Sequence, residues 1–270
     1  MTLSIITINY NNKNGLRMTA ESIFQQSWQD YEWIVVDGGS IDGSAQYISS
    51  VSNETSWWCS EKDTGVYNAM NKGIAHAQGE YLLFLNSGDT LYRQDTLQKV
   101  FDKHTDADVL YGNALFDNGK RPSVFKYDEQ LTLKSLYKYS VNHQSSFIKT
   151  KLLKERPYDE RFAITADWKR FMEMFLSGCK FVHLPFIISR YDTHGISSVN
   201  QDKVRKERKQ WIKELVPNYV SDVLEDWESF QNDQCIQTRE FRDKNRLFRR
   251  MIRSNLHLIR WLNKILYERV

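Results

Sequence analysis

The chain has few cysteines and no long apolar run. Its three cysteines, Cys59, Cys179 and Cys235, are odd in number and widely spaced. This pattern suits neither a disulfide framework nor a zinc site, so we expect reduced thiols. No stretch reaches the roughly 18 apolar residues of a membrane-spanning helix. Residues 1–10 lack the basic and small-residue signals of a secretory leader, and we therefore expect an unprocessed, cytoplasmic protein.

Acidic residues are nearly absent from the C-terminal segment. From Lys244 onward the net charge is +7, against +3 for the whole chain, so residues 1–243 carry −4. Basic residues recur at steps of four and three from Arg246 to Lys264, on one face of a predicted helix that has apolar residues on another. We predict that residues 244–267 either dock on an anionic membrane surface or fold back on the protein. Nucleic-acid binding is the weaker alternative.

The first half of the chain alternates short apolar runs with longer amphipathic segments. The pattern predicts strands over 3–8, 31–36, 57–60 and 81–85 and helices over 16–28, 43–50 and 66–77. Such alternation favours an α/β fold with a mostly parallel central sheet flanked by helices. Ligands of these sheets bind beyond the carboxyl ends of the strands. The polar loops after the first, second and fourth strands are therefore the candidate site.

The second half is less regular. We expect strands over 109–111, 145–148, 181–183 and 187–191 and a helix over 167–177. Beyond residue 200 the sequence is charged and helical, without a strand pattern. The prediction is an α/β domain over residues 1–200 and a helical, basic C-terminal extension over residues 201–270.

Two strand-end loops contain residues suited to a nucleotide and a cation. Asp37 ends the second strand within Asp-Gly-Gly-Ser, where a carboxylate can accept hydrogen bonds from a base or ribose and the glycines admit close approach. Asp89 follows the fourth strand within Asn-Ser-Gly-Asp, where one carboxylate can hold Mg²⁺ or Mn²⁺ against a diphosphate. Each loop is also typical of an ordinary turn, the first capped by Ser40 or Asp42.

Taken in order, the motifs resemble those of one enzyme family. Asp-Gly-Gly-Ser is followed by Asp-Thr-Gly-Val-Tyr-Asn-Ala-Met-Asn-Lys-Gly-Ile over 63–74, by Gly-Glu-Tyr over 79–81 and by Asn-Ser-Gly-Asp over 86–89. From Leu3 to about Ser198 the chain resembles family 2 of the inverting glycosyltransferases, which have the Rossmann-like GT-A fold. It is most similar to the branch that builds bacterial surface polysaccharides.

The resemblance implies an inverting hexosyltransferase. Such an enzyme moves a sugar from a nucleotide-sugar, with a UDP-sugar favoured, to a hydroxyl of a saccharide or lipid-linked saccharide. It implies that Asp37 contacts the uracil or ribose, that the first loop lines the base pocket, and that Asp63 closes it. The implied donor-binding residues are Asn9, Tyr10, Asp37, Asp63, Asn71, Lys72, Asn86 and Ser87.

The chain departs from the family pattern in two places, and both concern charge. Many relatives have Asp-Asp where this chain has Asp37-Gly38, and Asp-x-Asp-Asp where only Asp89 keeps a carboxylate. The resemblance implies a divalent metal, Mn²⁺ or Mg²⁺, at Asp89 and at His194 of a late polar loop. With the loss of charge, either the phosphates of the donor hold the metal or cations of the protein assist, so metal dependence is left open.

The resemblance also implies a catalytic base. Residues 159–168 are similar to the family stretch in which an Asp that opens a helix takes the proton of the acceptor hydroxyl, here Asp167. A carboxylate in the first turn of a helix also stabilises that helix, and the two roles are compatible. His143 and Gln144 match a His-Gln pair that faces the acceptor, with a structural histidine as the alternative.

Two other protein classes remain as interpretations. A degenerate transferase would bind a sugar nucleotide, or act as a scaffold, without turnover; the weakened metal loop favours it and Asp167 argues against it. A nucleotidyltransferase would need a basic, glycine-rich first loop, and residues 9–15 are rich in asparagine. The enzyme is the favoured interpretation. A lipid-linked acceptor and a basic tail together predict peripheral association with the inner face of the cell membrane.

Overall fold

The computed structural model describes residues 1–103, 105–117, 121–192 and 200–215. The chain forms two compact units, Met1–Lys209 and Gln210–Val270, and the first of these is the subject here. Nearly all of the second unit lies outside the described residues. The predicted domain boundary after residue 200 and the predicted basic helix over 244–267 therefore stay predictions.

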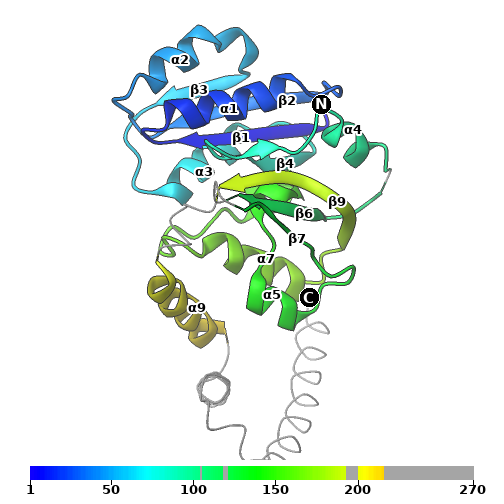
Figure 1. Cartoon of the computed structure of the whole chain (residues 1–270). Coiled ribbons are helices and arrows are strands. Elements are labelled where there is room, and N and C mark those ends of the chain that lie inside the picture. Colours follow the sequence, from blue (N-terminus) through cyan, green and yellow to red (C-terminus); the bar gives the residue numbers. More distant parts are fainter. Residues whose placement is uncertain (104, 118–120, 193–199, 216–270) are drawn as a thin grey trace, which may run out of the picture. The chain divides into compact units, whose positions relative to one another are not determined.

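A nine-stranded sheet, counted over the described residues, organises the first unit (Figure 1). Its order is β3-β2-β1-β4-β8-β6-β9-β5, and β7 pairs with β6. The strands are β1 (Leu3–Asn9), β2 (Tyr31–Asp37), β3 (Trp57–Ser60), β4 (Tyr81–Phe84), β5 (Thr90–Leu91), β6 (Val109–Asp117), β7 (Ser123–Phe125), β8 (Ser146–Lys149) and β9 (Phe181–Asp192). The first four strands run parallel, β8 runs antiparallel to its neighbours β4 and β6, and β6 pairs parallel with β9. The predicted α/β class is confirmed.

Helices lie beside this sheet and follow most of its strands (Figure 1). They are α1 (Lys13–Phe24), α2 (Ser44–Ser50), α3 (Val66–His76), α4 (Thr96–Phe101), α5 (Leu133–Tyr139), α6 (Thr150–Glu155), α7 (Ala166–Leu176) and α9 (Gln201–Leu215), with short 3₁₀ turns η1 (Ser52–Glu54) and η2 (His143–Ser145). Helix α3 contacts β1 and β2, and α5 contacts α7. No helix among the described residues has both the length and the apolar character that a membrane crossing requires.

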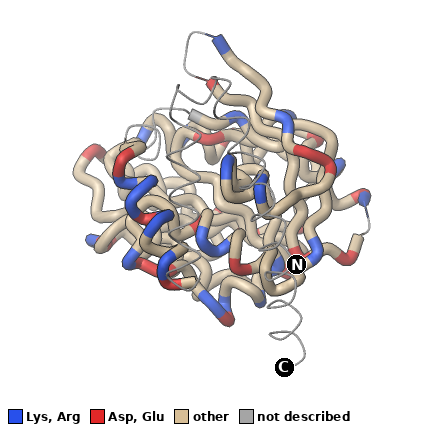
Figure 2. Tube along the Cα trace, turned by 90° about the horizontal axis from the view of Figure 1, so that it is seen from below, with Lys and Arg blue, Asp and Glu red and all other residues tan. Residues whose placement is uncertain are grey.

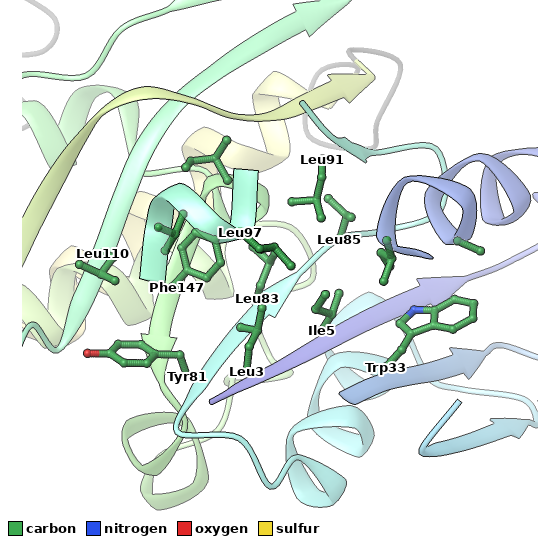
Figure 3. Packing of buried hydrophobic residues seen from close by; sticks show 14 of the residues in the cluster. Leu3, Ile5, Trp33, Tyr81, Leu83, Leu85, Leu91, Leu97, Leu110 and Phe147 are labelled. Carbon is green, nitrogen blue, oxygen red and sulfur yellow. The ribbon is translucent and has the colours of Figure 1, made fainter. Parts of the chain in front are cut away.

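The main core lies between the sheet and α1. Leu3 and Ile5 alternate along β1 toward this side (Figure 3). There they join apolar residues of α1 such as Leu16 and Ile23. Trp33 of β2 is also buried there, and its indole N–H donates to Thr7 Oγ1 at 2.9 Å. The alternation of side chains along β1 thus gives one face of the sheet an apolar surface, and α1 covers that surface.

The opposite face of β1 and β2 receives α3 at close range. A Cβ at Gly73 of α3 would lie 2.5 Å from Ile6 Cγ2, so the helix can approach β1 because this residue has no side chain. The turn into β4 is equally tight, since a Cβ at Gly79 would lie 2.5 Å from the Leu3 carbonyl carbon. These two glycines fix how α3 leads into β4.

Two expectations about the elements are corrected. Helix α1 ends at Phe24 and not at residue 28, because the Gln26 side-chain amide donates to the Arg93 carbonyl and residue 27 bonds to the chain near β5. The two strands expected over 181–191 are one strand, β9, with irregular register where Gly112 pairs with Leu184 and Asn113 with Ile187. The elements α4, α5, α6, β5 and β7 had no clear sequence pattern.

Charged residues are interspersed over the described trace (Figure 2). The described part of the chain shows both signs along the same elements, as in the Lys169–Glu173 pair of α7. Cys59 and Cys179 are free thiols, as expected. The marked charge asymmetry of the sequence thus belongs to residues outside the described ranges.

Candidate active site

Parallel register brings three polar side chains to one edge of the sheet. Asn9, Asp37 and Ser60 end β1, β2 and β3, and each is paired in register with its neighbour. The Asp37 carboxylate accepts from Asn9 Nδ2 at 2.6 Å and from Ser60 Oγ at 2.6 Å. Ser40 adds its hydroxyl at 2.6 Å and its backbone N–H at 2.9 Å. The carboxylate therefore ties three strand ends and the following loop together.

These bonds leave Asp37 with no accessible surface. A carboxylate has about four acceptor positions, and Asp37 fills four while being 0% exposed. Burial raises the pKa of Asp37, but the hydrogen bonds from Ser40, Ser60 and Asn9 outweigh it and leave the pKa below its ordinary value. The group is thus a buried, charged anchor, and its contact with a donor stays a prediction.

A neighbouring cluster faces outward from the same edge. A Cβ at Gly38 would lie 2.6 Å from Asp63 Oδ2 and 3.2 Å from Tyr10 Cδ2, so these three residues converge where Gly38 has no side chain. Tyr10 is 69% exposed. The Asp63 carboxylate accepts from Gly65 N at 3.0 Å. The Tyr10 ring and the Asp63 carboxylate therefore lie together beside the backbone of Gly38, which has no side chain.

The loop after β4 lies against the first loop and α1. Asn12 Nδ2 donates to the Ser87 carbonyl at 3.0 Å, and the Thr19 hydroxyl donates to the Asp89 carbonyl at 2.7 Å. Asp89 is 5% exposed. Among the described residues, Asn86 Oδ1 and Ser87 Oγ are buried without a hydrogen-bond partner. Buried polar atoms are nearly always paired, so these two are candidates for contact with a ligand or water.

The predicted base opens helix α7 and accepts three hydrogen bonds. Asp167 Oδ1 accepts from the Trp168 backbone N–H at 2.8 Å and from the Tyr67 hydroxyl at 2.7 Å. Tyr67 lies 2.8 Å from the Ile164 carbonyl as well, so its single hydrogen is shared. Asp167 Oδ2 lies 2.9 Å from His143 Nδ1. The Asp167 side chain is 19% exposed.

Electrostatics keep this carboxylate ionised. Burial raises the pKa of Asp167. The hydrogen bond and charge of His143, followed by the hydrogen bond of the Tyr67 hydroxyl, lower the pKa by more and leave it below the ordinary value. Burial, with the adjacent Asp167 carboxylate, raises the pKa of Tyr67 well above its usual range. Tyr67 is therefore a permanent donor, and Asp167 is a permanent acceptor near neutral pH.

His143 joins this carboxylate to the loop after β4. Its Nε2 lies 3.2 Å from Asn86 Nδ2, while its Nδ1 faces Asp167. The ring stands edge-on to Phe84 of β4, with the centroids 6.2 Å apart. Gln144 follows in η2 and is buried. A polar chain thus runs from a strand-end loop to the opening of α7.

Two predicted donor residues of α3 make protein contacts. Asn71 Nδ2 donates to the Tyr158 carbonyl at 2.9 Å, and its Oδ1 accepts from the Tyr158 N–H at 2.9 Å. Lys72 Nζ pairs with Glu61 Oε1 at 2.6 Å. Asn71 thereby connects α3 to the segment that leads to Asp167, and the donor roles of both residues stay predictions.

A carboxylate of α9 holds the segment before Asp167. Glu207 accepts from the backbone N–H groups of residues 163, 164 and 165, each at 3.0 Å, and from Thr165 Oγ1 at 2.9 Å. Glu207 is 7% exposed. These donors directly precede α7, so the carboxylate pairs the loop that leads into the helix and places a negative charge at the helix N-terminus.

The described residues offer a metal ion a limited set of ligands. No group of three or more His, Cys, Asp and Glu side chains among them is arranged to hold a metal. Asp89 offers one hard carboxylate ligand with a single charge. One such ligand fits Mg²⁺ or Mn²⁺ shared with donor phosphates, and does not fit a cation held by protein alone. His194 lies outside the described residues.

Sequence reasoning located the strand-end loops and Asp167, and the structure brings them together. It missed Tyr67 and Glu207. Tyr67 stands inside the motif over 63–74 and was given no role, although its place in that motif is a usable signal. Glu207 lies in a helix whose dense charge hides a single buried carboxylate. His143, expected on the acceptor side, bonds to Asp167.

Comparison with known proteins gives a consistent family. The family model described as "Glycosyl transferase family 2" matches residues 4–174. An uncharacterized glycosyltransferase of Mycobacterium tuberculosis strain H37Rv is 33% identical over 207 residues, which are 73% of this chain and 77% of the relative. A PGL/p-HBAD biosynthesis glycosyltransferase of the same strain is 31% identical over 206 residues, which are 73% of this chain and 76% of that protein.

Solved structures share the fold. Residues 1–349 of S. aureus TarS, in complex with UDP, align with a TM-score of 0.62 at 21% identity, over 77% of this chain and 64% of that chain. The mannosyltransferase PcManGT from Pyrobaculum calidifontis, in complex with GDP-Man and Mn²⁺, aligns with a TM-score of 0.55 at 15% identity, over 77% of this chain and 61% of that chain. The chain therefore spans less than two thirds of either structure. The likeness identifies the GT-A fold.

Proposed function

The chain belongs to glycosyltransferase family 2, and on that premise we propose that it transfers a hexose from a nucleotide-sugar to an acceptor hydroxyl with inversion. The observation that carries this proposal is the hydrogen-bonded connection from Asn86, in the loop after β4, through His143 to Asp167. It supports a carboxylate base standing beside the loops that the resemblance assigns to the donor. An inverting transfer needs such a base on the acceptor side of the anomeric carbon.

Asp167 Oδ2 is the oxygen suited to take the proton. Oδ1 accepts from Tyr67 and from the Trp168 N–H, which fills both of its acceptor positions. Oδ2 accepts from His143 alone among the described residues, so one position is left. The acceptor hydroxyl donates to it while its oxygen attacks the anomeric carbon. The nucleoside diphosphate leaves from the opposite face.

The outward cluster is suited to the base of the donor. We assign the stacking face to Tyr10 and the acceptor of a base N–H to Asp63, because both converge at Gly38. Asp37 then orders the pocket through Asn9 and does not contact the base. A carboxylate accepts equally from uracil or guanine, and the TarS and PcManGT structures contain UDP and GDP-Man. UDP is the favoured nucleotide on the strength of the resemblance.

A divalent cation, Mn²⁺ or Mg²⁺, would be held by Asp89 and the donor phosphates. When bound, it would neutralise the charge that develops on the departing diphosphate. Asn86 Oδ1 and Ser87 Oγ then face the donor as partners for its hydroxyls.

The acceptor class follows from the names of relatives. They include a PGL/p-HBAD biosynthesis glycosyltransferase and a putative teichuronic acid biosynthesis glycosyltransferase of Bacillus subtilis. We propose a saccharide or lipid-linked acceptor in surface polysaccharide or glycolipid synthesis. Docking of the basic residues 244–267 on the inner membrane face would bring the site to that acceptor. Liposome flotation should lose binding when residues 244–270 are removed; unchanged binding rejects the docking.

A thermal-shift screen tests the donor pocket. UDP, GDP, dTDP and CMP are each added with and without Mn²⁺ to the wild type, to Asp63→Ala and to Asp102→Ala, an exposed carboxylate at the end of α4. We expect UDP to raise Tm in the wild type and in Asp102→Ala. In Asp63→Ala the affinity should fall about tenfold or more, because a hydrogen bond to a charged group is lost. No shift with any nucleotide would contradict the proposed function.

A further inference from the structure

Three polar side chains from distant parts of the sequence form one line of contacts. Asn86 follows β4, His143 begins η2, and Asp167 opens α7. Asn86 Nδ2 lies 3.2 Å from His143 Nε2, and His143 Nδ1 lies 2.9 Å from Asp167 Oδ2. Both ring nitrogens of the imidazole are therefore engaged.

The two contacts constrain the proton on the imidazole. An ionised Asp167 is an acceptor only, so His143 Nδ1 must carry a hydrogen. An amide NH₂ is a donor only, so Nε2 must be bare when Asn86 Nδ2 faces it. The neutral Nδ1–H tautomer satisfies both contacts. With the Asn86 amide reversed, Oδ1 would face Nε2, and only a charged imidazolium would then satisfy both neighbours.

The surroundings hold the ring in this place. Its side chain is 14% exposed, and Phe84 stands against its edge. The turn that carries it is fixed because the Asn142 N–H donates to the Tyr127 hydroxyl at 2.9 Å and the Ser146 hydroxyl donates to the Asn142 carbonyl at 2.7 Å. The titratable groups that act on Asp167 are His143 and the buried tyrosines Tyr67, Tyr127 and Tyr158. These tyrosines are neutral.

We propose that Asn86 and His143 are positioning residues for the base: Asn86 donates to Nε2 and holds the ring from that side, and the hydrogen on Nδ1 aims Asp167 Oδ2. This role rests on the proposed function, in which Asp167 takes the acceptor proton. It gives Asn86 a task in this chain that an aspartate at the same position would not perform. An ionised carboxylate there has no hydrogen to donate to Nε2.

The tautomer can be measured without turnover. Long-range ¹⁵N–¹H correlation spectra of histidine-labelled full-length protein distinguish Nδ1–H, Nε2–H and imidazolium, and His143→Ala identifies the signal. We expect a hydrogen on Nδ1 and none on Nε2 in the wild type. In Asn86→Ala this preference should be lost, because no donor then faces Nε2. A wild-type ring that carries a hydrogen on Nε2 overturns the proposal.

Kinetics with a matched pair tests what the ring does for Asp167. In His143→Asn the amide nitrogen stands near the position of Nδ1 and can still donate to Asp167, whereas in His143→Gln it stands near the position of Nε2. We expect kcat to fall about 100-fold in His143→Gln, as for a misplaced catalytic group, with KM for the donor changed less than about threefold. His143→Asn should recover to within about tenfold of wild type.

Asn86→Asp adds a readout that misfolding would not mimic. Its ionised carboxylate can only accept, so the ¹⁵N–¹H spectrum of this variant should show a hydrogen on Nε2 of His143. If His143→Asn is no better than His143→Gln, or if Nε2 stays bare in Asn86→Asp, the positioning role is wrong while the transferase activity stands. If the wild type shows the Nδ1–H tautomer but turns over no nucleotide-sugar, the proposed function fails and this role fails with it.

Discussion

At the residue scale, the site contrasts two buried carboxylates. Asp37 has its four acceptor positions filled by Asn9, Ser40 and Ser60, so it orders the loops around it. Asp167 keeps one position on Oδ2 and some exposure. Partners, rather than residue type, therefore separate a structural acid from a reactive one.

The anchored Asp37 predicts acid sensitivity. Its folded pKa lies below the ordinary value of about 3.9, so its stabilisation is complete above that value and is lost as the pH falls through the folded pKa. We expect Asp37→Asn to be less stable than wild type at pH 7 by about 1–3 kcal/mol, from the lost charged hydrogen bonds. The difference should shrink below about pH 4. Urea unfolding from pH 7 to pH 3 measures this, and a constant difference would refute the anchor.

Much of the candidate site was predictable from single residues, but their pairings were not. Asp37, Asp63, Asp89 and Asp167 stand out because each follows a recognisable motif. The contact between His143 and Asp167 joins residues 24 apart, and that between Asn86 and His143 joins residues 57 apart. No local pattern encodes such contacts, since they depend on how η2 and α7 meet the end of β4.

At the element scale, α9 supports α7 through one carboxylate. Glu207 accepts three backbone N–H groups just before α7 and the hydroxyl of Thr165. These bonds hold the segment that delivers Asp167. The start of the predicted C-terminal extension thus serves the catalytic unit.

Replacing this carboxylate should affect both stability and turnover. We expect Glu207→Gln to lose about 1–3 kcal/mol, because an amide cannot accept from all four donors and lacks the charge that complements a helix N-terminus. The kcat should fall with little change in donor KM. Asp202→Asn, in an exposed pair with Arg205 of the same helix, is the control and should change stability by less than about 0.5 kcal/mol. If Glu207→Gln and Asp202→Asn have the same unfolding midpoint, the proposed support of α7 by Glu207 is wrong.

The sequence pattern predicted the secondary structure best in the first half of the chain, where strands alternate with helices that pack on the sheet. Strands β1, β2, β3 and β4 and helix α3 follow clear periodicities and lie within a residue or two of their predicted bounds. Strand β9 was expected as two strands, over 181–183 and 187–191. The register instead shifts opposite Gly112, whose missing side chain leaves room, since a Cβ there would lie 2.4 Å from Ile188 Cγ1. The pairing of β9 with β6, and not the local sequence, therefore determines the length of this strand.

At the scale of the whole molecule, the parallel half of the sheet brings the carboxyl ends of its strands together, and the mixed half leads to the proposed base. Strands β1 to β4 bring the loops after β1, β2 and β4 together, and β8 extends the sheet from β4. The turn η2, directly before β8, delivers His143 beside the loop after β4. The fold therefore places the loops predicted to bind the donor beside the predicted acceptor-side residue His143.

The most direct test of the account is release of the nucleoside diphosphate from a panel of nucleotide-sugars by wild type and Asp167→Asn. Water can take the place of the acceptor in this assay. We predict that kcat falls by about 10²–10⁴ in Asp167→Asn, the usual contribution of a general base, while the thermal shift produced by the nucleotide is kept. Turnover by Asp167→Asn within about twofold of wild type, with the same pH profile, would contradict the assignment of the base.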